Sequence, residues 1–160
     1  MAFSTKEIID IAIGIEDTGY YFYTRCAEKF ENPLLKETFS FLADEELLHK
    51  AFFESLEPEM KDAEGVYTTE YFQYLTAMSD GKVFSDKDNI DRAIAEITAP
   101  LDAINLALDA EKDSIFYYSE LRELYESKTD TLTALNKIIN EERRHVIILL
   151  EIRDKIALTE

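Results

Sequence analysis

The sequence predicts an all-α fold, an antiparallel bundle of four long helices with a long crossover between the second helix and the third. Hydrophobic residues make up 46% of the 160 residues, whereas there are only four glycines and three prolines. So few helix-breaking residues leave long uninterrupted segments, and apolar residues recur at helical spacing through four of them. The length suits a single domain with a substantial core, which we expect to span residues 1–160.

The first two helices are marked by residues typical of helix starts. Ser4 and Glu7 form a capping-box pattern, and the apolar periodicity that follows predicts a helix over about residues 5–31. Asn32 and Pro33 suit the cap and the first turn of a second helix, because proline is favoured at the first helical position. We expect this helix over about residues 33–56.

Residues 57–98 are the least regular part of the chain and form the predicted crossover. A short helix is expected near residues 69–78, and another near residues 89–97. The crossover is rich in aromatic residues, which either cover the bundle or make a dimer contact: Tyr67, Tyr71, Phe72, Tyr74 and Phe84.

The second half of the chain predicts another pair of helices. Ala99 and Pro100 open a third helix over about residues 99–127, and a fourth is expected over about residues 130–157 after a short turn. Two helical hairpins joined by a long crossover form one of the known connectivities of four-helix bundles.

The two histidines occur in the same local pattern. His49 and His145 each follow a glutamate by three residues, and residues three apart lie on one face of a helix. About thirty residues before each of these pairs, a further glutamate lies in an apolar helical segment. The result is a set of four carboxylates and two imidazoles: Glu16, Glu46, His49, Glu111, Glu142 and His145. Four-helix bundles hold two metal ions with this combination of ligands.

Each of these six side chains lies in the middle of an apolar helix face that has to be buried. An unpaired buried carboxylate costs several kcal/mol, so four at one level would require cations. The alternative is that each glutamate turns to solvent or pairs with arginine or lysine. That alternative would have to apply at four positions, and we therefore favour metal binding.

The two halves of the chain repeat each other nearly in register. Aligning Glu16 with Glu111 also aligns Tyr23 with Tyr118, two turns further along the same faces. Each tyrosine is either a core residue or a catalytic residue whose hydroxyl bonds a ligand carboxylate.

Three further ionisable residues have open or minor roles. Glu45 and Glu141 precede the histidines by four residues and lie about 100° around the helix from the ligands. They either support the ligands from outside the metal site or belong to the surface.

Cys26 is the only cysteine, which excludes an internal disulfide and a four-cysteine metal module. We expect Cys26 to be a small core residue.

The charge and the N-terminus limit the possible partners. A net charge of −17 argues against binding to nucleic acid or to an anionic membrane surface. The first residues lack the basic and apolar regions of a signal peptide, and no apolar run approaches the length of a membrane span. We therefore expect a cytoplasmic protein.

The ligand pattern resembles the rubrerythrin branch of the ferritin-like superfamily of di-iron carboxylate proteins, over nearly the whole chain. The resemblance implies two iron or manganese ions per chain, bridged by Glu46 and Glu142. It implies that Glu16 with His49 completes one metal site, and that Glu111 with His145 completes the other.

The sequence departs from this family in two ways. Full-length rubrerythrins carry a rubredoxin domain, which needs four cysteines where this chain has one, so electrons would come from an external donor or from Fe²⁺ itself. Peroxidase-type rubrerythrins also have a glutamate three residues after the ligand of the third helix, where this chain has Ser114. The counterpart after Glu16 is Gly19. Both small residues indicate either room beside the metals or a close helix contact.

The sequence thus favours an oxidoreductase that acts on O₂ or peroxide with externally supplied electrons. One alternative is an iron-binding or ferroxidase protein with Fe²⁺ as its substrate, and another is a metal-free helical interaction bundle. We expect a homodimer or a larger homo-oligomer. Iron storage would require a hollow assembly, whereas an enzyme can function as a dimer.

Overall fold

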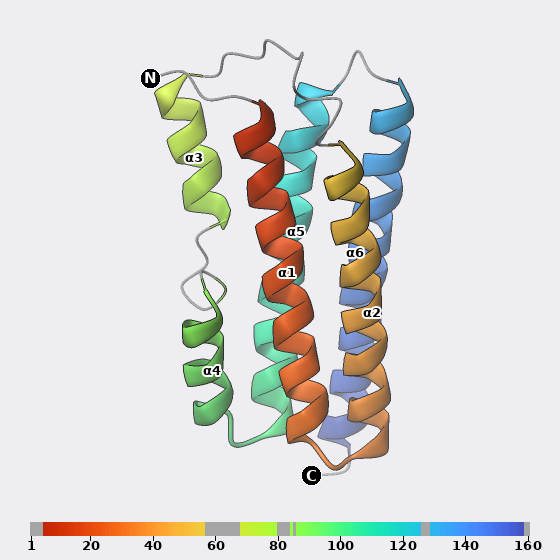
Figure 1. The fold of residues 1–160 in the computed structure, drawn as a ribbon. Coiled ribbons are helices and arrows are strands. Elements are labelled where there is room, and N and C mark those ends of the chain that lie inside the picture. Colours follow the sequence, from red (N-terminus) through yellow and green to blue (C-terminus); the bar gives the residue numbers. More distant parts are fainter. Residues whose placement is uncertain (1–4, 57–67, 80–83, 85, 126–128, 159–160) are drawn as a thin grey trace.

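The computed structural model describes residues 5–56, 68–79, 84, 86–125 and 129–158 (Figure 1). These ranges contain six helices and no strand. The helices are α1 (Thr5–Lys29), α2 (Pro33–Leu56), α3 (Thr69–Ser79), α4 (Lys87–Glu96), α5 (Pro100–Leu124) and α6 (Thr129–Ala157). The expected cap residue Ser4 and the crossover aromatic Tyr67 lie outside the described residues.

The four long helices form two hairpins that lie side by side. Helix α1 packs along α2, α5 packs along α6, and the hairpins meet through α1 with α5 and α2 with α6. The crossover helices α3 and α4 lie one below the other along the outside of the bundle, where α3 touches both α1 and α5 and α4 packs on α1 (Figure 1). This arrangement confirms the predicted all-α bundle with a long crossover.

Side-chain caps and prolines set several helix starts. The carboxamide of Asn32 accepts hydrogen bonds from the backbone N–H groups of Leu34 and Leu35, at 3.0 and 3.3 Å, beside Pro33 at the first position of α2. Asp86 caps α4 by accepting from the N–H of Asn89 at 2.8 Å. These caps satisfy N–H groups that have no partner within the first helical turn.

Two apolar clusters fill the bundle, one towards each end. The first contains Phe22, Phe39 and Leu149 and receives α4 through Ile90 and Ile94. The second contains Ile8, Phe53, Tyr117 and Leu135 and receives α3 through Leu75. Along each long helix, the residues that belong to one cluster are separated from those of the other by the predicted metal ligands. The core is therefore interrupted at mid-height by one polar layer.

Helix α4 is fastened to α1 by polar contacts as well as by its apolar face. The hydroxyl of Tyr21 donates to Asp91 at 2.9 Å, and Nε of Arg25 donates to the same carboxylate at 3.1 Å. Lys87 pairs with Asp17 at 2.9 Å.

None of the helices in the described ranges combines the length and the apolar character needed to cross a membrane.

Candidate metal centre

All six predicted ligands lie together in the polar layer, and each residue is at most 6% exposed. Glu16 comes from α1, Glu46 and His49 from α2, Glu111 from α5, and Glu142 and His145 from α6. The helical spacing explains this convergence, since a glutamate and a histidine three residues apart occupy one face of their helix. None of the four glutamates turns to solvent.

The ligand atoms fall into two groups that share two carboxylates. Glu16, Glu46, His49 and Glu142 form the first group, in which one oxygen or nitrogen atom of each residue lies within 4.8 Å of the others. The second group is Glu46, Glu111, Glu142 and His145, at the same spacing. Because Glu46 and Glu142 belong to both groups, each group has one carboxylate and one imidazole of its own.

In both histidines, the ring nitrogen Nδ1 faces the carboxylates. Nδ1 of His49 lies 2.8 Å from Glu142, 3.5 Å from Glu46 and 3.7 Å from Glu16. Nδ1 of His145 lies 3.4 Å from both Glu111 and Glu142. The two rings are nearly parallel, with centroids 5.7 Å apart.

Several of these buried atoms are close to one another without forming hydrogen bonds. Nδ1 of both histidines, Oε2 of Glu111 and both carboxylate oxygens of Glu142 have no hydrogen-bond partner in the described part of the chain. A buried polar atom without a partner is costly, and ligand atoms that converge on a common point without hydrogen-bond geometry are what a metal site requires. The residues present therefore fit a metal centre.

The protein alone stabilises this layer poorly. Burial, together with the charge of Glu46, raises the pKa of Glu16 well above its ordinary value. Burial and the charge of Glu142 raise the pKa of Glu111 to about 8. Burial by itself lowers the pKa of His145, but the carboxylates of Glu111 and Glu142 outweigh it and raise that pKa to about 10. In the absence of a metal cation, bound protons thus offset the repulsion between the buried carboxylates.

Two tyrosines cross the bundle to reach carboxylates of the opposite half. The hydroxyl of Tyr23 on α1 donates to Oε1 of Glu111 on α5, and the hydroxyl of Tyr118 on α5 donates to Oε1 of Glu16 on α1. Both tyrosines are buried. Each of these glutamates therefore uses one oxygen for a tyrosine and turns the other towards a histidine. The sequence left open whether each tyrosine bonds a carboxylate, and it did not indicate which half of the chain supplies the partner.

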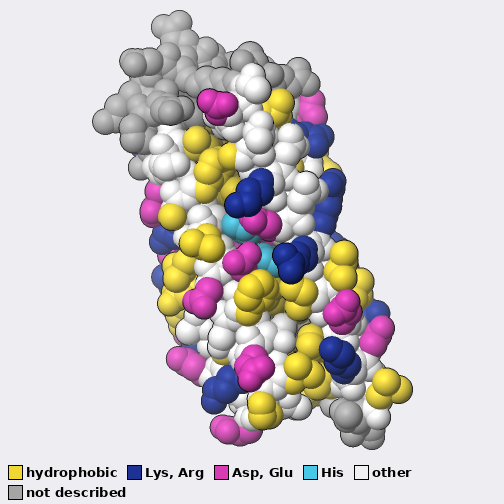
Figure 2. Space-filling view, turned by 90° about the vertical axis from the view of Figure 1, so that its right-hand side faces the viewer, with side chains coloured by type: hydrophobic (Ala, Val, Ile, Leu, Met, Phe, Trp, Pro, Cys, Tyr) yellow, Lys and Arg dark blue, Asp and Glu magenta, His cyan; other side chains and the backbone are white. Residues whose placement is uncertain are grey.

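The outer edges of the two histidine rings have different surroundings, which the sequence did not reveal. Nε2 of His49 lies 3.2 Å from the carboxylate of Glu141 on α6. Nε2 of His145 has no hydrogen-bond partner among the described residues. The ring of Phe41 is nearly perpendicular to the ring of His145, with the two centroids 6.4 Å apart. Histidine side chains are visible on this face of the molecule between acidic and basic groups (Figure 2).

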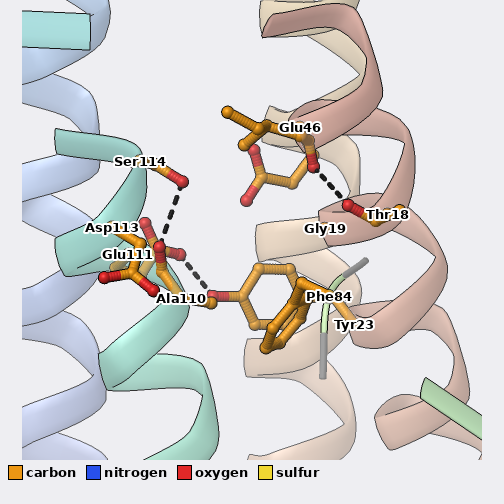
Figure 3. A pocket seen from close by; sticks show the side chains of 10 residues that line it. Thr18, Gly19, Tyr23, Glu46, Phe84, Ala110, Glu111, Asp113 and Ser114 are labelled. Carbon is orange, nitrogen blue, oxygen red and sulfur yellow. Dashed lines mark hydrogen bonds between the residues drawn. The ribbon is translucent and has the colours of Figure 1, made fainter. Parts of the chain in front are cut away.

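A small cavity of about 40 Å³ adjoins the polar layer on the side of α1 and α5 (Figure 3). Its lining includes carboxylates of the layer and small or apolar residues: Ile15, Thr18, Gly19, Tyr23, Glu46, Phe84, Ala110, Glu111, Asp113 and Ser114. A cavity of this size holds only a few water-sized molecules. Gly19 and Ser114 thus border open space beside the predicted ligands.

Comparison with known proteins agrees with this geometry. A family model described as rubrerythrin matches residues 7–153, a range that contains all six predicted ligands. A crystal structure of a Thermotoga maritima protein described as ferritin-like and diiron-carboxylate superposes with a TM-score of 0.69. That protein is 27% identical, and the match covers 96% of this chain and 97% of that chain. No curated protein sequence gives a significant match.

Proposed function

The chain belongs to the rubrerythrin family, and from this premise we propose that it is a binuclear non-haem iron oxidoreductase acting on O₂ or peroxide with electrons from an external donor. The observation that carries the proposal is the pair of buried ligand groups that share Glu46 and Glu142. Carboxylate and imidazole ligands suit iron, and they also suit manganese.

The residues divide into shared and separate ligands. Glu46 and Glu142 would bridge the two ions, because both belong to each group. Glu16 with His49 would complete one site, and Glu111 with His145 the other. When bound, an iron pair supplies the electrons that reduce an oxygen compound and takes up replacements from the donor.

The protein positions these ligands and restricts access to them. Tyr23 and Tyr118 fix one oxygen of Glu111 and of Glu16, so that the second oxygen of each faces the centre. The cavity beside Gly19 and Ser114, of about 40 Å³, is large enough for a molecule of two or three heavy atoms. This size agrees with O₂ or hydrogen peroxide as the substrate.

A ferroxidase, with Fe²⁺ as the substrate, is the second candidate. The net charge of −17 favours it, because an acidic surface raises the local concentration of cations. A metal-free interaction bundle is less well supported, since buried ligand atoms without hydrogen-bond partners would then have no function.

The experiment that separates the two metal-dependent functions supplies O₂ or hydrogen peroxide to protein loaded anaerobically with Fe²⁺. The oxidoreductase proposal predicts repeated turnover when a chemical reductant is added, with no further uptake of iron. A ferroxidase would instead require continued Fe²⁺ and would accumulate ferric iron.

We propose that the protein is a homodimer or a larger homo-oligomer. Light scattering measures the size of this assembly, and a large hollow assembly would favour iron storage.

A further inference from the structure

The outer nitrogen of His49 has a contact that has no counterpart at His145 among the residues that the structure describes. Glu141 lies on α6, which packs against α2 where the two hairpins meet, and its side chain is 29% exposed. Its carboxylate is 3.2 Å from Nε2 of His49, whose other nitrogen, Nδ1, faces the ligand carboxylates. Lys137, one turn earlier on α6, lies 3.6 Å from the same carboxylate.

The internal repeat makes the difference informative. Glu45 precedes His49 by four residues, as Glu141 precedes His145, so that each glutamate has the same place in its own half. Glu141 nevertheless reaches the histidine of the opposite hairpin, whereas Nε2 of His145 is buried without a hydrogen-bond partner in the described part of the chain. The apolar ring of Phe41 lies near His145, with the two ring centroids 6.4 Å apart. The two histidines therefore have equivalent places in the ligand set, but in the described part of the chain only His49 has a carboxylate beside its outer nitrogen.

We infer that Glu141 is a positioning residue for His49 and that it makes the two metal positions unequal in affinity, the one completed by Glu16 and His49 being the tighter. This inference rests on the proposed metal centre. It extends that proposal by assigning a role to a residue outside the six ligands.

The physical basis is the coupling between the two nitrogens of an imidazole ring. When Nε2–H donates to a carboxylate, the proton is held on Nε2, and Nδ1 is left as the free and more basic electron pair. The ring is also held in one orientation. Removing such a carboxylate typically lowers metal affinity about 10- to 100-fold. Among the described residues none gives His145 such support, so only the position of His49 should respond.

The test is a titration of the metal-free full chain with Co²⁺, followed by calorimetry and by proton NMR of the paramagnetic complex. Wild-type protein should bind two Co²⁺ ions in unequal steps and show one shifted N–H resonance for each histidine. Glu141→Ala should weaken the tighter step about 10- to 100-fold and move one N–H resonance, leaving the other step and resonance unchanged. Glu141→Gln should restore most of the affinity, because the amide oxygen still accepts the hydrogen bond.

Glu45→Ala is the matched control, since it removes the corresponding glutamate of the other half and should change neither step. Equal weakening of both steps by Glu141→Ala, no weakening at all, or the same effect from Glu45→Ala would overturn the inference. The unaffected step also reports that the variant is folded. If the wild type binds no Co²⁺, the metal centre itself fails and the role of Glu141 with it. If two Co²⁺ ions bind and neither affinity changes in Glu141→Ala, the role of Glu141 is rejected and the metal centre is not.

Discussion

Gly19 on α1 faces the side chain of Glu46, a predicted ligand shared by both groups. A Cβ atom at this position would stand 3.2 Å from Oε1 of Glu46 and 3.3 Å from its Cδ. At Gly14, five residues earlier on the same helix, a Cβ atom would meet no atom of the described residues within 4 Å. The absence of a side chain at residue 19 therefore leaves room for a ligand carboxylate.

We predict that Gly19→Ala weakens metal binding even though it favours the helix. Alanine within a helix is better than glycine by roughly 0.5–1 kcal/mol, so both Gly14→Ala and Gly19→Ala should raise the stability of the metal-free protein. Only Gly19→Ala displaces Glu46, and only this variant should lose affinity in a Co²⁺ titration. Equal affinities for the two variants would show that Glu46 adjusts without cost.

Ser114 occupies the position at which peroxidase-type rubrerythrins have an additional glutamate. Its hydroxyl donates to the backbone carbonyl of Ala110 at 3.1 Å, and the residue borders the cavity. We predict that the wild-type protein reduces hydrogen peroxide poorly and that Ser114→Glu raises the rate, because a further carboxylate can follow the change in metal charge on oxidation.

The measurement for Ser114 is single-turnover oxidation of the reduced, iron-loaded protein by peroxide, with O₂ as the comparator. Asn105→Glu adds a carboxylate on an exposed part of the same helix and serves as the control. Fast oxidation by peroxide in the wild type, unchanged or slowed by Ser114→Glu, would show that six ligands are sufficient.

At the scale of elements, α4 contributes to the main core although it lies outside the four long helices. Ile90 is fully buried in the cluster that contains Phe22 and Leu149. We predict that Ile90→Ala lowers the free energy of unfolding by about 2–5 kcal/mol, the usual cost of truncating a buried isoleucine. Urea unfolding measures this, with the exposed Asp88→Ala as the control. A loss below about 1 kcal/mol would mean that α4 is only loosely attached.

The sequence predicted the long elements better than their mutual contacts. Asn32 with Pro33 and Ala99 with Pro100 mark helix starts through local chemistry, which a sequence records directly. The first helix ends at Lys29, two residues before the expected end at 31, because the periodic pattern continues past the last helical turn. The pairing of α4 with α1 through Asp91 depends on how a crossover of many residues folds back, and no local pattern encodes that.

The same distinction applies to the site. The convergence of the six predicted ligands was predictable because spacing along one helix determines which side chains share a face. The contact of Glu141 with His49, and its absence at Glu45, was not predictable, since it depends on the relative rotation of α2 and α6. Likewise, the pairing of Tyr23 with Glu111 requires the packing of α1 against α5.

For the molecule as a whole, we expect the polar layer to make stability depend on pH and on metal. The pKa of Glu111 is raised from 4.5 to about 8 and that of His145 from 6.5 to about 10. A raised pKa in the folded state gives stability that is present below the unfolded pKa and is lost as the pH rises through the folded value. These two groups should therefore make the metal-free protein less stable as the pH rises from about 5 to 10.

We predict that the free energy of unfolding, measured in urea with a chelator present, is lower at pH 8.5 than at pH 5.5. The loss is at most about 1.4 kcal/mol per pH unit for each group. Glu111→Gln should reduce this slope. Added Fe²⁺ should reverse it, because metal binding requires deprotonated ligands. Metal-free stability that increases over this range, with a slope indifferent to Glu111→Gln, would contradict the description of the layer.

The most direct test of the metal centre is elemental analysis after anaerobic reconstitution with Fe²⁺ and removal of unbound metal. Two groups that share Glu46 and Glu142 predict about two iron ions per chain, with most of the iron lost in both Glu46→Ala and Glu142→Ala. A single tightly held ion per chain that neither substitution affects would contradict the account.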